Sequence, residues 1–282
     1  MLPLLICAYQ KARINFIAPK MEPFDVVVFS EAFDNRMRTI LIKSMAKVYS
    51  YYTRILRDPK NANNKISICQ NGGVIIFSKY EILEQDQTYY YKTPCQAILK
   101  YLNPSHFIAC KGSDCLAQKG VVYAKILKNE LPYHIFASHL QASYKTKEKY
   151  QKVREKQLNI LNDFIESKFL PVNEPVIIAG DLNVDRLSSK EEYDCMLKTL
   201  NATIPDIQIG PNYTVNPENN CLADKGAPEY IDYVLFRKNH NIPYHSTIET
   251  KLFKCDKPYL KKGKLCDALS DHYPVVCNCS FN

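Results

Sequence analysis

Pro175-Val-Ile-Ile-Ala-Gly-Asp-Leu-Asn-Val-Asp185 is the stretch that decides the fold. Its residues 176–179 form a short continuous apolar run, typical of a β-strand buried on both faces of a sheet, and Gly180 ends the run. Asp181 and Asn183 follow at the carboxyl end of the strand, where open α/β sheets carry their binding sites. A carboxylate and an amide at this spacing can share a metal, a phosphate or an attacking water. They can also form a simple turn, so the rest of the chain must decide between a turn and a site.

The length and composition indicate one large domain over residues 1–282, because no Pro/Gly/Ser-rich linker or internal repeat divides the chain. Apolar residues make up 46% of the sequence, enough for a sizeable core, and no apolar run is long enough to cross a bilayer. The net charge of +8 favours polyanions or an anionic membrane surface. It leaves nucleic acid and lipid both open as partners.

The sequence favours an oxidising compartment. Its 11 cysteines are many for a protein of the reducing cytosol. Three acceptor sequons for N-glycosylation begin at Asn201, Asn212 and Asn278. Together these features predict a secreted or otherwise extracytosolic glycoprotein with disulfides.

Two disulfides are plausible from proximity in the sequence, Cys110 with Cys115 and Cys255 with Cys266, although sequence alone does not determine connectivity. The odd number of cysteines leaves at least one thiol unpaired. Residues 1–8 are apolar but lack the basic leader of a signal peptide, so we expect them inside the domain.

Polar residues also follow other predicted strands. Glu31 follows a strand over residues 25–29, and helical spacing then predicts a helix over 37–48 that Asp34 or Asn35 caps. An acid between a strand and a helix is either a metal ligand or a salt-bridged structural residue. The other expected elements are helices over residues 11–18, 146–168 and 190–200 and strands over residues 73–78 and 88–92.

His139 ends the second strand of a pair predicted over residues 121–127 and 133–140. A lone histidine in such a position is more often a structural residue than a catalyst. Position alone therefore leaves both roles open for His139.

Two strands are expected to close the chain, one over residues 230–236 and one after Pro274. Asp232 lies inside the first of these apolar runs and needs a partner, because an unpaired buried carboxylate is costly. Asp271 and His272 come directly before the second strand. We assign Asp232 as the acid that orients the imidazole of His272, an arrangement typical of general bases.

The polar strand-end residues are too many to be independent accidents. The chain resembles the endonuclease/exonuclease/phosphatase, or DNase I-like, superfamily in Gly180-Asp-Leu-Asn183, Ile231-Asp-Tyr233 and Ser270-Asp-His-Tyr-Pro274. The resemblance implies an α/β (α+β) fold in which two stacked mixed β-sheets flanked by helices form a four-layer sandwich. The seven candidates are Glu31, His139, Asp181, Asn183, Asp232, Asp271 and His272.

Within that superfamily the chain is most similar to the neutral, Mg²⁺-dependent sphingomyelinases. The stretches Glu31-Ala-Phe-Asp-Asn35, His139-Leu-Gln-Ala142 and Pro228-Glu-Tyr-Ile-Asp-Tyr233 carry this narrower similarity. It implies hydrolysis of sphingomyelin, or a related choline phospholipid in membranes, to ceramide and phosphocholine with Mg²⁺ as cofactor. It also implies a monomer without a nucleic-acid partner.

The resemblance implies roles for the candidate catalytic residues. His272, held by Asp232, takes a proton from the attacking water. Asp181 and Asn183 position that water and the phosphate. His139 donates a hydrogen bond or a proton near the phosphate and the departing alkoxide, and binds the substrate together with Asn183.

The resemblance also implies a metal site and a membrane contact. Glu31 is expected to hold Mg²⁺, with Asp271 as a further contact. The family's first strand carries a metal-binding Asn, and Met1-Leu-Pro3 resembles only the tail of that motif, so the first strand is expected to be truncated. Residues 255–266 correspond to a membrane-entering hairpin of bacterial relatives, although an ordinary surface loop fits them equally well.

Two rival interpretations remain open. A Mg²⁺-dependent nuclease of the same superfamily would share the catalytic set, and the positive charge favours it. A catalytically impaired lipid-binding homologue would explain an incomplete first strand. The residues flanking Glu31 and His139 argue against the nuclease, and the intact Asp181, Asn183, Asp232 and His272 argue against loss of activity.

Overall fold

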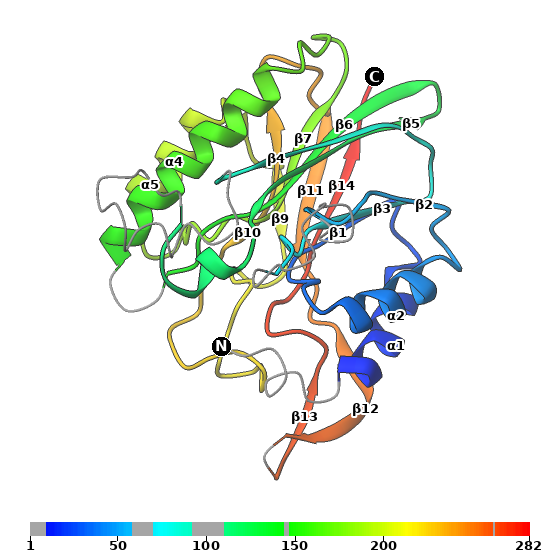
Figure 1. Cartoon of the computed structure of the whole chain (residues 1–282), viewed down its shortest axis with the longest axis vertical. Coiled ribbons are helices and arrows are strands. Elements are labelled where there is room, and N and C mark those ends of the chain that lie inside the picture. Colours follow the sequence, from blue (N-terminus) through cyan, green and yellow to red (C-terminus); the bar gives the residue numbers. More distant parts are fainter. Residues whose placement is uncertain (1–9, 58–69, 92–109, 144–146, 262) are drawn as a thin grey trace.

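The apolar run after Pro175 forms the strand β7 (Val176–Asp181), which lies inside a six-stranded sheet. A computed structural model describes residues 10–57, 70–91, 110–143, 147–261 and 263–282 (Figure 1). Residues 1–8, including the motif Met1-Leu-Pro3, lie outside this range, so their expected place in the domain is not described. The helices are α1 (Gln10–Met21), α2 (Asn35–Met45), the 3₁₀ helix η2 (Gly112–Leu116), α4 (Lys147–Glu166) and α5 (Lys190–Thr199).

The six-stranded sheet brings three of the candidate site residues into register. β7 runs parallel to β6 and antiparallel to β10, which places Asp181 opposite His139 on one side and Asp232 on the other. These strand ends therefore meet at one edge of the molecule. In spatial order the strands are β4 (Ile82–Tyr89), β5 (Gly120–Lys128), β6 (Leu131–His139), β7, β10 (Asp232–Arg237) and β8 (Ala202–Thr203).

Two three-stranded sheets, one early and one mainly late in the chain, lie against the six-stranded sheet (Figure 1). A separate hairpin projects from the end of the molecule. The first small sheet has the order β1 (Val26–Phe29), β3 (Ile75–Ser78) and β2 (Tyr51–Tyr52). The second has the order β14 (Val275–Ser280), β11 (His245–Thr250) and β9 (Ile207–Ile209), and the hairpin pairs β12 (Lys254–Lys261) with β13 (Lys264–Ala268).

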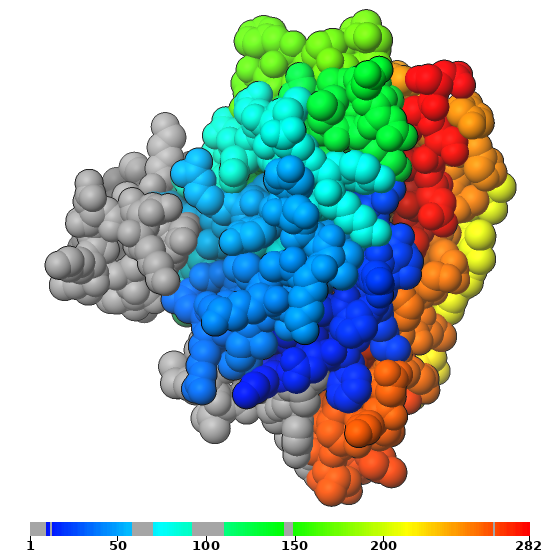
Figure 2. Space-filling view, turned by 90° about the vertical axis from the view of Figure 1, so that its right-hand side faces the viewer, coloured from blue at the N-terminus to red at the C-terminus, as the bar shows by residue number. Residues whose placement is uncertain are grey.

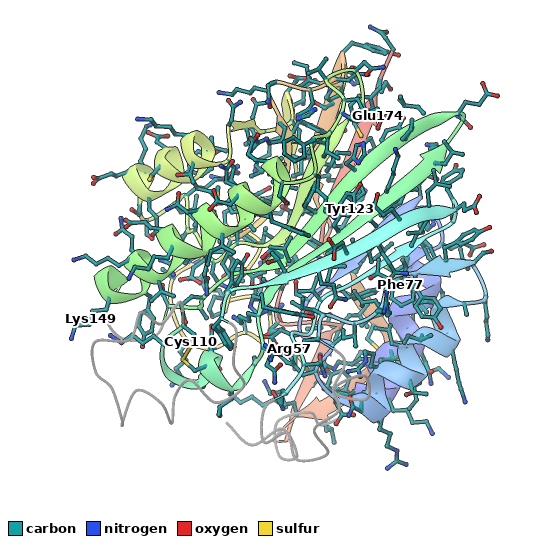
Figure 3. All side chains as sticks on the ribbon, turned by 45° about the horizontal axis from the view of Figure 1, so that its top comes forward. Arg57, Phe77, Cys110, Tyr123, Lys149 and Glu174 are labelled. Carbon is teal, nitrogen blue, oxygen red and sulfur yellow. A yellow bond between two sulfur atoms is a disulfide. The ribbon has the colours of Figure 1, made fainter. Side chains whose placement is uncertain are left out.

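Alternating side chains of the strands fill three layers of core. On β5, Val121 and Tyr123 point toward α4 and α5, whereas Val122 and Ala124 point between the sheets, as the two-residue period of a strand requires. A third cluster, which includes Phe77, packs β1 and β3 against α1 and α2. Figure 3 shows Tyr123 and Phe77 in these separate parts of the core. The predicted four-layer sandwich is confirmed.

Several element predictions are confirmed and two are wrong. Asp34 caps α2, because its side chain accepts a hydrogen bond from the Met37 amide. The strand predicted over 88–92 is instead Ile82–Tyr89, and Lys92 lies outside the described residues. The C-terminal region contains β11, β12 and β13 in addition to the two predicted strands. Residues 255–266, which the resemblance implied to be a hairpin, lie in the hairpin of β12 and β13, although these exposed, lysine-rich strands carry no continuous apolar pattern.

One predicted disulfide is confirmed and the other is wrong. Cys110 pairs with Cys115, but Cys266 pairs with Cys221, and Cys255 is a buried free thiol. The hairpin register places Tyr259, not Cys255, opposite Cys266. The segment that carries Cys221 meets the hairpin instead, where Lys261 donates a hydrogen bond to the Cys221 carbonyl.

Cys221→Ala is expected to lower the free energy of unfolding by about 2–4 kcal/mol without reductant, because the bridge constrains the unfolded chain. Urea denaturation measures this difference, and Cys195→Ala, on an exposed free thiol of α5, is the matched control. Peptide mapping without reductant should recover Cys221 linked to Cys266. A Cys255–Cys266 peptide would contradict the assignment.

Candidate active site

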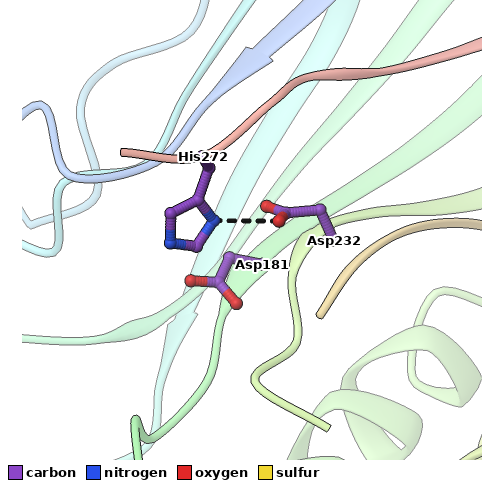
Figure 4. Close-up of side chains that lie close together, drawn as sticks. All are labelled: Asp181, Asp232 and His272. Carbon is purple, nitrogen blue, oxygen red and sulfur yellow. Dashed lines mark hydrogen bonds and ion pairs between the residues drawn. The ribbon is translucent and has the colours of Figure 1, made fainter. Parts of the chain in front are cut away.

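The carboxyl ends of β6 and β7 and the amino end of β10 form the floor of the candidate site. His272 reaches it from the loop before β14, and Figure 4 shows its ring beside Asp232 and Asp181. Segments far apart in the sequence therefore converge on one small volume.

His272 and Asp232 form a hydrogen-bonded pair, in which Nδ1 of the ring donates to Oδ2 at 2.9 Å. The Thr214 hydroxyl accepts the amide of Asp232 at 3.4 Å, and Asn220 donates to the Asp271 carbonyl at 3.0 Å, so side chains hold the backbone on both sides of the pair. Burial opposes a charge on His272, but the carboxylates of Asp232, Asp181 and Asp271 outweigh it and raise the pKa of His272 well above its ordinary value. The bond to Asp232 leaves Nε2 as the atom that can take a proton.

Asp181 is almost fully buried, and burial together with the nearby charge of Asp232 raises its pKa to about 8. The backbone that delivers it needs a glycine, because a Cβ on Gly180 would lie 2.1 Å from the Ser138 carbonyl oxygen. Asn183 has φ of 52°, its amide donates to Asp181 at 2.9 Å, and its side chain donates to the Leu140 carbonyl at 3.1 Å. The Gly-Asp-Leu-Asn stretch is thus a turn, and the same turn holds a carboxylate at the site.

His139 is 2% exposed and lies on a buried lysine that the sequence analysis did not single out. Its Nε2 is 3.4 Å from Asp181 Oδ2 and 3.0 Å from Lys119 Nζ. Lys119 also donates to Asp114 at 2.6 Å and to the Leu140 carbonyl at 2.8 Å, so its three N–H groups have three acceptors. Nε2 therefore accepts from Lys119, and the ring proton lies on Nδ1, which bonds to no described residue.

The environment of His139 favours the neutral ring. Burial, followed by the charges of Lys119 and His272, lowers the pKa of His139 well below its ordinary value. Its buried Nδ1–H is a donor directed away from the lysine. Two histidines with opposite pKa shifts therefore lie in one site, one charged and one neutral at neutral pH.

Lys119→Met is expected to destabilise the fold by about 3–5 kcal/mol, because it removes the ammonium group that pairs with the buried Asp114 carboxylate. It should also raise the pKa of His139, which ¹H NMR titration measures. The double variant Lys119→Met with Asp114→Leu should recover most of the lost stability in urea denaturation. If the single variant unfolds like wild type, the buried ion pair has no such role.

Glu31 and Asp271 lie at the mouth of the site and line the same cavity of about 710 Å³ as Asp181, Asp232 and His272. Glu31 has φ of 59°, a left-handed conformation that turns the chain between β1 and α2. Although the residue is exposed at the cleft mouth, the protein atoms crowded around its carboxyl and the charge of Asp271 raise the pKa of Glu31. Among the described residues, none forms a hydrogen bond or ion pair with that carboxyl group.

Two clusters of side chains have the donor atoms for a divalent cation. One is Asp181 with Asp232 and His272, and the other is Glu31 with Asp271. Ligand atoms of Asp181, Asp232 and His272 all lie within 4.8 Å of one another. In the first cluster, however, the hydrogen bond between His272 and Asp232 already pairs two of the three side chains. Glu31 and Asp271 repel each other without a compensating bond at Glu31, and a cation between them would remove that repulsion. The chemistry of the donors therefore favours Glu31 and Asp271 as the metal site.

The structure brings together Glu31, Asp271 and the five residues predicted to be catalytic, which are Asp181, Asp232, His272, His139 and, in the turn below, Asn183. Sequence reasoning missed Lys119, Asp114, Thr214 and Asn220. Lys119 had a weak signal, because a lysine in the apolar surroundings of β5 needs a partner. Thr214 and Asn220 had none, since they lie in an irregular segment.

The comparisons with known proteins agree with this geometry. The Endonuclease/Exonuclease/phosphatase family matches residues 10–272. A sphingomyelinase C of Bacillus cereus is 34% identical over 295 residues, which cover 96% of this chain and 82% of that protein. A crystal structure of beta toxin from Staphylococcus aureus is 30% identical with a TM-score of 0.82, over 96% of this chain and 93% of that one. A beta-toxin mutant with bound magnesium ions gives the same identity and TM-score over 96% and 92%. The chain therefore belongs to the endonuclease/exonuclease/phosphatase family and, within it, to the sphingomyelinases C.

Proposed function

We propose that this chain hydrolyses the phosphodiester of sphingomyelin to ceramide and phosphocholine. The observation that carries the proposal is that the His272–Asp232 pair and Asp181 line a single cavity, with the His139 ring 3.4 Å from the Asp181 carboxyl group. The sphingomyelinase C and beta toxin relatives support sphingomyelin as the substrate rather than another phosphodiester.

His272 acts as the general base. Its Nδ1 is committed to Asp232, so Nε2 takes the proton as water attacks phosphorus in line with the departing ceramide oxygen. The carboxylate of Asp232 stabilises the imidazolium that forms and keeps the ring oriented. The raised pKa of His272 strengthens it as a base and means that the unprotonated ring is most populated at alkaline pH.

Asp181, Asn183 and His139 position the reacting groups. Asp181 orients the attacking water beside His272, and Asn183 holds the Asp181 carboxyl group through the hydrogen bond that its backbone amide donates. The neutral ring of His139 lies with Nε2 3.4 Å from Asp181 Oδ2 and helps to position that carboxyl group. Lys119 holds this tautomer without touching the substrate.

Glu31 and Asp271 would hold Mg²⁺ at the mouth of the site. Bound there, the cation would supply positive charge near the phosphoryl oxygens and the alkoxide leaving group, where negative charge builds during the reaction. The beta-toxin structure with magnesium ions supports this choice of metal.

The test is release of phosphocholine from sphingomyelin in mixed micelles by the purified chain, with Mg²⁺ and with EDTA in parallel. Mg²⁺-dependent release with plasmid DNA left intact is the expected result. Nicking of the plasmid without phosphocholine release would instead establish the nuclease. A folded chain without either activity would favour the interpretation of the chain as a catalytically impaired lipid-binding homologue.

We also infer that the hairpin of β12 and β13 contacts the bilayer. Leu260 and Leu265 are paired across its tip and are 57% and 74% exposed, with Lys261 and Lys264 paired beside them. Apolar side chains flanked by lysines suit a membrane surface. Among the described residues, no helix has the length and hydropathy needed to span a bilayer.

Leu260→Glu combined with Leu265→Glu is expected to weaken binding to sphingomyelin-containing vesicles by about tenfold or more, because both leucines would lose apolar burial. Vesicle sedimentation measures the binding, and turnover of a short-chain, monomeric substrate should stay unchanged. Ile242→Glu, at an exposed apolar residue outside the hairpin, is the control. Unchanged sedimentation of the double variant would refute the contact.

The disulfides and the glycosylation sequons support an oxidising, extracytosolic compartment. The Cys110–Cys115 and Cys221–Cys266 bridges need oxidising conditions to persist, and the acceptor residues Asn201, Asn212 and Asn278 are all exposed. We propose a secreted, glycosylated monomer that acts on the outer surface of membranes. Treatment with an N-glycosidase should increase the gel mobility of the chain from a eukaryotic secretion host.

A further inference from the structure

An irregular segment between β9 and β10 holds the turn that carries His272. Its Asn220 is 1% exposed, and the side-chain Nδ2 donates to the carbonyls of Ser270 at 2.9 Å and of Asp271 at 3.0 Å. The Oδ1 of the same side chain accepts the amide of Leu222 at 3.0 Å, so both polar atoms of the buried side-chain amide have partners. Asn220 therefore fixes the backbone of the two residues that directly precede His272.

The same segment also holds the residue after His272 and the strand that carries Asp232. The amide of Tyr273 donates to the Thr214 carbonyl at 2.7 Å, and the Tyr273 hydroxyl donates to the Asn219 carbonyl at 2.9 Å. The Thr214 hydroxyl accepts the amide of Asp232 at 3.4 Å. The segment is thus bonded to the backbone beside both partners of the His272–Asp232 pair, whose own hydrogen bond is 2.9 Å long.

A disulfide anchors this segment to the hairpin of β12 and β13. Cys221, next to Asn220 in the sequence, is bonded to Cys266 of β13. The Lys261 ammonium of β12 donates to the Cys221 carbonyl at 2.7 Å. Figure 2 shows the hairpin in orange at the lower end of the molecule. Because Asn220 belongs to no helix or strand, these two bonds at Cys221 take the place of regular backbone pairing in fixing its position.

We propose that Asn220 is a positioning residue for the hydrolysis, and that the Cys221–Cys266 disulfide holds it in place. The inference rests on the proposed function, because Asn220 acts through His272 and does not touch the reacting atoms. By fixing the turn, it keeps the His272 ring at hydrogen-bonding distance from Asp232, with Nε2 left to take the proton of the attacking water. A misplacement of about 1 Å can cost an enzyme much of its rate, so hydrogen bonds that hold the backbone of the base affect turnover.

The first test replaces Asn220 with serine, whose hydroxyl can still accept the Leu222 amide but cannot reach the two carbonyls. The kcat for a short-chain, monomeric sphingomyelin should fall about tenfold, while KM stays within about twofold of wild type. Asn216→Ser is the matched control, because Asn216 is 6% exposed in the same segment and accepts the Glu218 amide in a similar turn. It should keep wild-type kcat. A rise in KM without a fall in kcat, or an equal fall in kcat for the control, would overturn the proposal.

The second test follows the turn itself by amide hydrogen exchange in the absence of substrate. In Asn220→Ser the amide of Tyr273, which bonds to the Thr214 carbonyl, should exchange about tenfold faster, because the turn opens more often. In Asn216→Ser the same amide should exchange as in wild type. Unchanged exchange at Tyr273 in the Asn220 variant would overturn its role. This readout needs no turnover, so it separates failure of the inference from failure of the proposed hydrolysis.

The third test asks whether the disulfide acts through Asn220. Without reductant, Cys221→Ala should lower kcat about tenfold, and combining it with Asn220→Ser should lower kcat no more than about twofold further, because both changes release the same turn. Cys195→Ala, at an exposed free thiol, should keep wild-type kcat. Effects that multiply to about a hundredfold would show that the disulfide and Asn220 act independently, and would overturn the coupling.

Discussion

Replacing His272 with alanine is expected to lower kcat/KM for sphingomyelin by roughly 10³-fold or more, because the attacking water loses its base. The side chain is half-buried and, within the described part of the chain, bonds through its ring to Asp232 alone, so the variant should fold. Phosphocholine release at saturating Mg²⁺ measures the loss.

The matched control for that loss is His240→Ala. The ring of His240 contacts another part of the chain, where its Nδ1 donates a hydrogen bond to the Pro171 carbonyl. Its variant should keep wild-type turnover. If His272→Ala retains activity within about threefold of wild type, the base lies elsewhere and the assignment is wrong.

Asp181→Asn is expected to change activity and stability in opposite directions. Turnover should fall about 10²-fold, because an amide orients the attacking water less well than a carboxylate. Stability should rise, because the folded chain holds Asp181 at a pKa of about 8 against an ordinary value of 3.8. A raised carboxyl pKa means that ionisation favours the unfolded chain.

The sign of the stability effect sets its pH window. Below pH about 4 the carboxyl is protonated in both states and the variant gains little. Between the ordinary pKa and about 8 the wild-type penalty grows, and above that it is constant. The variant should therefore exceed wild type by on the order of 5 kcal/mol at pH 8.

Urea denaturation in EDTA at pH 4 and pH 8 measures this difference. Asp194→Asn, an exposed acid on α5 in an i,i+4 pair with Lys190, should show no comparable gain. A variant that is less stable than wild type at both pH values would mean that the Asp181 carboxyl group stabilises the fold. It would contradict the expected free-energy cost of ionising this buried group. Such a cost is common at functional sites.

The sequence alone determined the parts of this protein that depend on short-range patterns. Apolar runs ended by Gly or a polar residue predicted β1, β6, β7 and β10, and the polar residues at their ends predicted one edge of the molecule as the site. The Asp232–His272 contact was predictable because a buried carboxylate requires a partner, and His272 lies at the start of another strand. The catalytic roles of these residues remain predictions.

Tertiary structure decided what depends on packing between distant segments. Lys119 lies under His139 only because η2 and β5 pack against the end of β6, and no local pattern carries that contact. Cys266 pairs with Cys221 across 45 residues because the hairpin register turns it away from Cys255. Local sequence encodes each strand, but hydrogen bonding between edges and burial against the second sheet determine which strands become neighbours.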